Sequence, residues 1–299
     1  MRLLRFGQKS RGWSRVQAVL ALVTGMSSFE IGAAMAKNLF GTFSAEQMVG
    51  LRVCLASVML LILVRPRVEY LTRANIKLFI PYGAAMAMMN LFFYIALSRM
   101  ALGLAVTIEF IGPLSLALFG SRRWMDIFWA FIVMIGLFLI LRPDRSFHNV
   151  DPIGVAAALC SAVGWIIYLL AGTRVSKVVP GAQAAAIGMS FAGLLLLPCF
   201  VIALPTAYAN PSASLTAIWI AVLSSAIPYL LEIIAMRRLN PRELGILLSL
   251  EPAFGSFSGI IFLGEALYLS QWMGIICVMG ASAGNVLSRK GKPPSGTKK

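Results

Sequence analysis

Charged residues are scarce in this sequence. Asp, Glu, Lys and Arg make up 12% of the 299 residues, whereas hydrophobic residues make up 59% and the mean hydropathy is +0.85. Soluble domains carry about 25% charged residues, so this chain has too little charge for a water-facing surface. The composition excludes a soluble enzyme, a disordered protein and a secreted disulfide scaffold, and it predicts an all-α polytopic membrane protein.

The residues of enzyme and metal sites are also rare. The chain has one histidine and four cysteines, and the cysteines lie inside apolar runs without the spacing of metal ligands. HExxH, Walker A and pore-loop patterns are absent, which argues against an intramembrane metalloenzyme, direct use of ATP and a channel. We therefore expect a protein that is not an enzyme and has no cofactor or bound metal.

Long apolar runs are what the sequence does contain. A membrane-crossing helix needs about 20 mostly apolar residues. Ten runs approach or exceed this length, at 16–36, 45–64, 77–97, 101–120, 124–141, 152–172, 182–204, 213–235, 243–263 and 268–288. Local signals mark several starts, including a Ser44–Gln47 capping box and the helix-starting pair Asp151–Pro152.

The excess of basic residues predicts the orientation of these helices. The formal net charge is +15, which in a soluble chain would suggest a nucleic-acid partner. Here most Lys and Arg residues fall in tails and loops on one predicted side, and cytoplasmic loops are rich in such residues. We expect both termini in the cytoplasm, basic tails at 1–15 and 289–299, and no nucleic-acid partner.

The chain divides into two related halves, at 16–141 and 152–288. When the second half is aligned on the first, Pro252 falls on Pro113 and Arg238 on Arg99. Each half has five predicted helices, and an odd number inverts the second half in the membrane. The sequence thus predicts ten transmembrane helices in two inverted five-helix repeats, an arrangement typical of secondary transporters.

Five charged residues lie inside the predicted spans: Glu30, Arg52, Glu109, Glu232 and Glu251. Charges in a membrane are costly, so they face a partner or an aqueous cavity. Arg52 can form a fixed pair with Glu30 or with Glu109, and a remaining acid would be free to bind an ammonium group or a proton. Glu232 has a second interpretation, in which its side chain simply reaches the cytoplasmic interface.

Two prolines, Pro113 and Pro252, lie in these spans beside Glu109 and Glu251. Proline lacks the N–H that would bond the carbonyl four residues earlier, so both helices should be interrupted next to a carboxyl group. Interrupted helices at matching places in two repeats indicate a transport site, although the prolines could also cause only a structural kink.

Uncharged candidates for a cavity wall lie on several helices. Asn90 and Tyr94 share a face, Ser225, Tyr229 and Glu232 have the spacing of one helical stripe, and Trp165 and Tyr168 lie deep in the sixth span. Such residues could bind a polar solute, while core packing is the simpler reading of the aromatic ones.

Several segments carry a resemblance to a known family. They are 32–40 (GAAMAKNLF), 109–114 (EFIGPL), 227–229 (IPY), 249–253 (SLEPA) and 262–265 (FLGE). In these segments the chain resembles the EamA branch of the drug/metabolite transporter superfamily, over most of its length.

The resemblance implies a bacterial inner-membrane exporter of small amino acids, of the threonine or homoserine kind, or of related metabolites. The solute would move by alternating access, and transport could be coupled to protons. The expected partners are a small solute and the lipid bilayer, and the resemblance does not fix the oligomeric state. Export of aromatic amino acids or of a nucleotide-linked metabolite is the alternative. The resemblance also makes Lys37 a lesser candidate for the solute carboxylate and implies that the fifth and tenth helices are peripheral.

Overall fold

The fold is a bundle of helices. The computed structural model describes residues 11–119, 124–141, 151–236, 238–239 and 241–288, without the side chains of 11–15, 117–119, 229–230, 233–234, 236 and 241–242. In this part of the chain every regular element is a helix. Most of the two basic tails predicted from the sequence lies outside the described residues.

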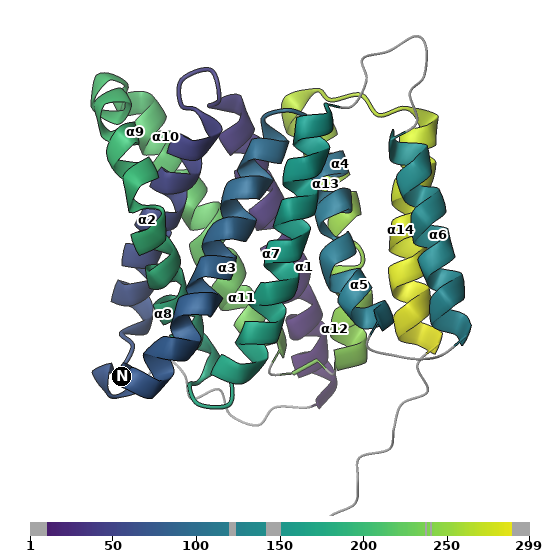
Figure 1. Cartoon of the computed structure of the whole chain (residues 1–299), viewed down its shortest axis with the longest axis horizontal. Coiled ribbons are helices and arrows are strands. Elements are labelled where there is room, and N and C mark those ends of the chain that lie inside the picture. Colours follow the sequence, from purple (N-terminus) through teal and green to yellow (C-terminus); the bar gives the residue numbers. More distant parts are fainter. Residues whose placement is uncertain (1–10, 120–123, 142–150, 237, 240, 289–299) are drawn as a thin grey trace, which may run out of the picture.

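The helices follow the predicted runs in order (Figure 1). They are α1 (Arg11–Asn38), α2 (Ala45–Val64), the short η1 (Val68–Tyr70), α3 (Arg73–Leu97), α4 (Leu102–Glu109), α5 (Ile111–Phe119), α6 (Trp124–Leu141), α7 (Pro152–Val175), α8 (Gly181–Leu195), α9 (Leu197–Ala209), α10 (Pro211–Ala221), the π-helical η2 (Val222–Ala226), α11 (Ile227–Met236), α12 (Pro241–Leu248), α13 (Glu251–Leu263) and α14 (Leu269–Ser288).

The length and composition of these helices fit a membrane protein. Among the described residues, six helical segments are long and apolar enough to cross a membrane, with 243–263 (α12 and α13 together) counted as one of them. A seventh span results if α8 and α9 also count as one. Shorter apolar helices cover 102–116 and 211–226. Large apolar side chains such as Phe131, Met134 and Phe138 of α6 are exposed on the surface of the bundle. Such a surface suits lipid and not water.

Predicted helix starts are confirmed. The Ser44 hydroxyl accepts a hydrogen bond from the Gln47 N–H at 3.2 Å, and the Gln47 side chain accepts one from the Ser44 N–H at 2.9 Å. The Asp151 carboxylate caps α7 by accepting from the Ile153 N–H at 2.9 Å. These side chains satisfy N–H groups that a helix start leaves without partners.

Several predicted spans are not continuous helices. The run at 101–120 divides into α4 and α5 after Glu109, and the run at 243–263 divides into α12 and α13 before Glu251, at the two places where the prolines predict an interruption. A bend of 70° between α8 and α9 and the π-helical turn η2 have no counterpart in the predictions. Pro198, in the first turn of α9, lacks the N–H needed to continue α8.

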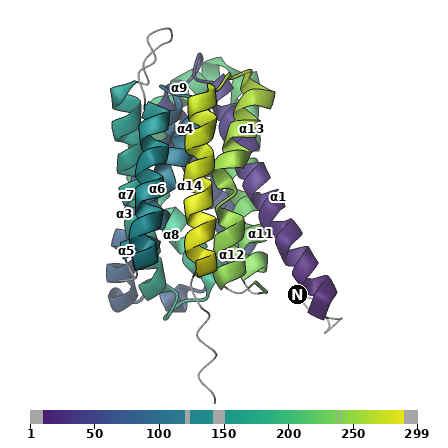
Figure 2. The same cartoon turned by 90° about the vertical axis from the view of Figure 1, so that its right-hand side faces the viewer.

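Helix α1 lies along one side of the bundle in Figure 2 and packs mainly against helices of the second half. These are α10, η2, α11, α12 and α13. The pair α6 and α14 lies at one edge, and α2, α9 and α10 lie at the other (Figure 1). The start of α1 and the end of α14 lie at the same end of the bundle (Figure 2); we call it the terminal end, and the other the far end.

Candidate solute site

A cavity of about 350 Å³ lies inside the bundle. Its walls come from α1, α3, α4, α5, α7, η2, α11, α12, α13 and α14, so both halves of the chain contribute. On α1 the wall residues begin at Leu22, on α12 they begin at Leu244, and on α14 they end at Val286. The cavity therefore extends through the half of the bundle near the terminal end.

Six residues singled out from the sequence line this cavity: Glu109, Pro113, Trp165, Tyr168, Glu232 and Glu251. Seven others lie outside its wall: Glu30, Lys37, Arg52, Asn90, Tyr94, Ser225 and Pro252. The side chain of Tyr229 is outside the described part. Three carboxyl groups thus share one apolar-walled space, which is the main chemical feature of the cavity.

The helix interruptions position two of these acids. Glu109 is the last residue of α4 and Glu251 is the first residue of α13. Pro113 cannot donate to the Glu109 carbonyl because it has no N–H. Each half of the chain therefore brings a carboxyl group to the cavity at a break in a helix.

The Glu109 carboxyl group has a specific partner. The Ser161 hydroxyl of α7 lies 2.5 Å from Glu109 Oε1 and 2.7 Å from the Met89 carbonyl oxygen. A hydroxyl has one hydrogen and cannot donate to two acceptors in full. Both short contacts are full hydrogen bonds only when Glu109 carries a proton and donates to Ser161, which in turn donates to Met89.

Glu30 and Glu251 have carboxyl oxygens without partners. Glu30 is completely buried, and neither of its oxygens has a hydrogen-bond partner among the described residues; the same holds for Oε2 of Glu251. An unpartnered buried carboxylate is strongly disfavoured. These groups therefore favour binding a proton or a cation.

Arg52 makes no direct ion pair with Glu30 or Glu109, the possibility that the sequence left open. No carboxylate of the described residues lies within 4.0 Å of its guanidinium. Arg52 donates to Tyr94 Oη at 3.3 Å and to Asn90 Oδ1, and its guanidinium lies over the rings of Phe29 and Tyr94 at 5.4 and 5.0 Å. Neutral side chains hold the cation, and this explains why Asn90 and Tyr94 are buried with it.

The predicted stripe on the eighth span is interrupted. Ser225 is buried, and its hydroxyl has no hydrogen-bond partner among the described residues, whereas its neighbour Ser224 lines the cavity together with Glu232. The π-helical turn η2 holds both serines and changes the register of the following helix. Regular helical spacing could not anticipate this shift.

Sequence reasoning missed the contribution of the last helix. Ser282 and Asn285 of α14 line the cavity, so this helix is more than a peripheral scaffold, although it packs with α6 at the edge of the bundle. The buried Asn285 amide donates to the buried Asp126 carboxylate of α6 at 2.8 Å. The signal available in the sequence was the presence of the polar residues Ser282 and Asn285 inside an apolar run.

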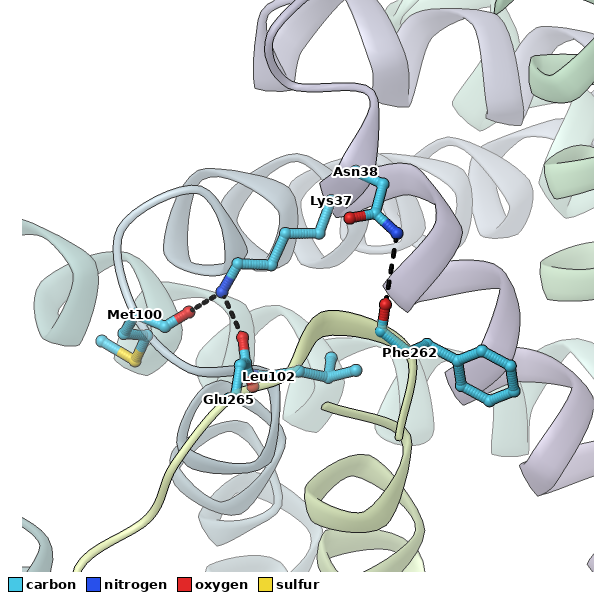
Figure 3. Close-up of polar contacts among 6 residues, drawn as sticks. All are labelled: Lys37, Asn38, Met100, Leu102, Phe262 and Glu265. Carbon is cyan, nitrogen blue, oxygen red and sulfur yellow. Dashed lines mark hydrogen bonds and ion pairs between the residues drawn. The ribbon is translucent and has the colours of Figure 1, made fainter. Parts of the chain in front are cut away.

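At the far end, a cluster of polar contacts joins the two halves (Figure 3). Lys37 Nζ, at the end of α1, lies 2.6 Å from Glu265 Oε1 and 2.6 Å from the Met100 carbonyl oxygen. The Leu102 N–H donates to Glu265 Oε2 at 2.8 Å. Lys37 is therefore occupied by Glu265 in this conformation.

Comparisons with known proteins agree with the helical architecture. The model of the EamA-like transporter family matches residues 152–287. The threonine/homoserine exporter RhtA of Salmonella typhimurium is 35% identical over 92% of this chain and 93% of its own. RhtA of Escherichia coli K12 is 35% identical over 90% and 91%.

A solved crystal structure has the same fold. Its TM-score is 0.57 at 17% identity, and the match covers 90% of this chain and 96% of that chain. With relatives of this identity over nearly the whole length, the chain belongs to the EamA-like transporter family.

Proposed function

We propose that this protein exports small amino acids of the threonine or homoserine kind across the bacterial inner membrane. The observation that carries the proposal is the cavity shared by Glu109, Glu232 and Glu251, because carboxylates in an apolar space are suited to a solute with an ammonium group. The RhtA relatives, which are named as threonine/homoserine exporters, support this class of solute.

The proposed topology has ten membrane passes in two inverted repeats, 16–141 and 152–288. Both termini lie in the cytoplasm, so the terminal end of the bundle faces inward and the far end outward. The broken helices α4–α5 and α12–α13, each with a glutamate at the break, support this internal symmetry.

Alternating access requires that one end of the bundle be closed while the other admits solute. The cavity reaches toward the terminal end. At the far end, the contacts of Lys37 with Glu265 and Met100 tie α1 to the α13–α14 connection and to the α3–α4 connection (Figure 3). This conformation fits a carrier that is loaded from the cytoplasm.

Proton exchange is the proposed driving reaction. The chain of contacts from Glu109 through Ser161 to Met89 is complete only with a proton on Glu109, and Glu251 has an unpartnered oxygen in the same cavity. We expect an imposed pH gradient to change the export rate in proteoliposomes. An export rate that is independent of the pH gradient would contradict proton coupling.

The function is tested by growth resistance of a strain that overexpresses the protein. Cells would be challenged with threonine, homoserine, an aromatic amino acid and toxic analogues of each. We expect resistance to threonine and homoserine; resistance confined to aromatic compounds would favour the alternative solute class, and resistance to none would contradict export of amino acids.

The same assay tests the acids of the cavity. Glu109→Gln and Glu251→Gln should abolish resistance at unchanged membrane levels of the protein, because each removes the charge that attracts an ammonium group or exchanges a proton. The exposed Glu69 lies outside the cavity, and Glu69→Gln is the matched control. Resistance equal to wild type in both cavity variants would remove these residues from the site.

A further inference from the structure

Arg52 is a buried cation that no carboxylate of the described residues contacts directly. Its side chain is 1% exposed, its Nε atom has no hydrogen-bond partner, and no carboxylate of the described residues lies within 4.0 Å. A guanidinium has five N–H donors, and within the described part of the chain only the bonds to Asn90 and Tyr94 use them. Burying such a group without an anion is costly.

The surroundings of Arg52 hold its position. Asn90 accepts from the guanidinium and donates to the Met86 carbonyl at 2.7 Å, so its amide orientation is set from both sides. The Tyr94 ring lies below the guanidinium at 5.0 Å while its hydroxyl accepts a hydrogen bond. The cation is therefore preorganised by neutral groups that leave donors available.

Among the described residues, a single aromatic ring links the Arg52 guanidinium to the cavity wall. Phe29 lies over the Arg52 guanidinium at 5.4 Å and also lines the cavity. Unlike Arg52, Phe29 is partly exposed. A change in the rotamer of one side chain is fast compared with movements of helices, so displacement of the ring would connect the cation to the cavity without a backbone rearrangement.

We propose that Arg52 binds the carboxylate of the transported amino acid after the Phe29 ring moves aside. This inference rests on the proposed function and completes its site. The glutamates of the cavity would take the ammonium group, and the guanidinium would take the carboxylate in the bidentate geometry that arginine favours. The ligand class is thereby narrowed to solutes that carry both charges.

The test compares threonine with threoninol, in which a CH₂OH group replaces the carboxylate. Binding to the purified protein would be followed by the fluorescence of tryptophan, since Trp165 lies in the cavity wall, and by calorimetry. For the wild type we expect threonine to bind about tenfold to a hundredfold more tightly, the range that charge-assisted hydrogen bonds provide. Equal affinities in the wild type would overturn the inference without any variant.

Variants separate this role from a structural one. Arg52→Gln should bind threonine and threoninol equally, Arg52→Lys should keep part of the preference, and Phe29→Ala should keep it in full. Arg99→Gln, which removes an exposed arginine from its pair with Asp151, should match the wild type. A variant that merely perturbs folding would weaken both ligands alike and leave their ratio unchanged, and that result for a folded Arg52→Gln would contradict the proposal.

The outcome also distinguishes this inference from the proposed function. A wild-type protein that binds and exports threonine without preferring it to threoninol would refute only the role of Arg52. A wild-type protein that neither binds nor exports threonine or homoserine would refute the proposed function and the assignment of Arg52 with it.

Discussion

Lys37→Met tests whether the contacts at the far end keep that end closed. Lys37 makes two contacts of 2.6 Å, to Glu265 and to the Met100 carbonyl, and the side chains of the ion pair are 23% and 12% exposed. Methionine keeps the length and apolar character of the side chain but can donate no hydrogen bond. The substitution therefore removes the contacts with little change of volume.

The expected magnitude follows from this geometry. A hydrogen bond to a charged group contributes about 1.5–3 kcal/mol, and partial exposure reduces the value for an ion pair. We take about 2 kcal/mol for the two contacts together, which corresponds to a shift of about thirtyfold toward the open far end. Only contacts formed in one state change the balance between states.

Hydrogen exchange is the appropriate assay, because the Leu102 N–H donates to Glu265 Oε2 in the closed cluster. We expect the peptide containing Leu102 to exchange at least tenfold faster in Lys37→Met than in wild type. Arg99→Gln is the matched control, because it breaks another ion pair at the same end of the bundle. The side chains of that pair, Arg99 and Asp151, are more exposed, at 42% and 31%. Unchanged exchange in Lys37→Met, or an equal increase in Arg99→Gln, would refute the closing role of the cluster.

Two further predictions concern the ends and the packing of helices. Hydrogen bonds from Arg99 and the Ile153 N–H lower the pKa of Asp151, so its contribution to stability is present above the usual aspartate range and is lost only as the pH falls below about 4; Arg99→Gln should raise this pKa toward its usual value in an NMR titration, and no change would contradict the assigned cause. A Cβ atom on Gly50 would lie 2.5 Å from the backbone nitrogen of Phe200, whereas one on Gly280 would meet nothing within 4 Å. Gly50→Ala should therefore lower the unfolding temperature in detergent, at a cost of about 1–3 kcal/mol, and Gly280→Ala should not; equal temperatures would contradict the close contact of α2 with α9.

The sequence predicts the order of the apolar helices because lipid imposes a simple rule, whereas ten membrane passes stay a prediction beside the six or seven candidate spans of the described residues. A segment must be long and apolar to cross the bilayer, so the runs in the sequence correspond in order to the helices. The interruptions beside Glu109 and Glu251 are also readable, because Pro113 and Pro252 are local causes. The bend between α8 and α9 and the turn η2 depend in addition on packing between helices, which no local pattern records.

The candidate site is only partly readable for the same reason. Charges inside apolar runs stand out, and Glu109, Glu232 and Glu251 do line one cavity. Which charges meet is a property of the assembled bundle, and the possible pairing of Arg52 with a glutamate does not take the form of a direct ion pair in the described residues. Sequence reasoning also could not anticipate that Phe29 contacts this cation, because an isolated aromatic residue in an apolar helix carries no distinctive signal.

The most direct test of the central claim is solute counterflow in proteoliposomes that contain only the purified protein. Vesicles loaded with unlabelled homoserine should accumulate labelled threonine, whereas vesicles with Glu251→Gln should not. Accumulation in both preparations would contradict the assignment of the cavity as the transport site. Absence of accumulation with the folded wild-type protein would contradict the export of small amino acids itself.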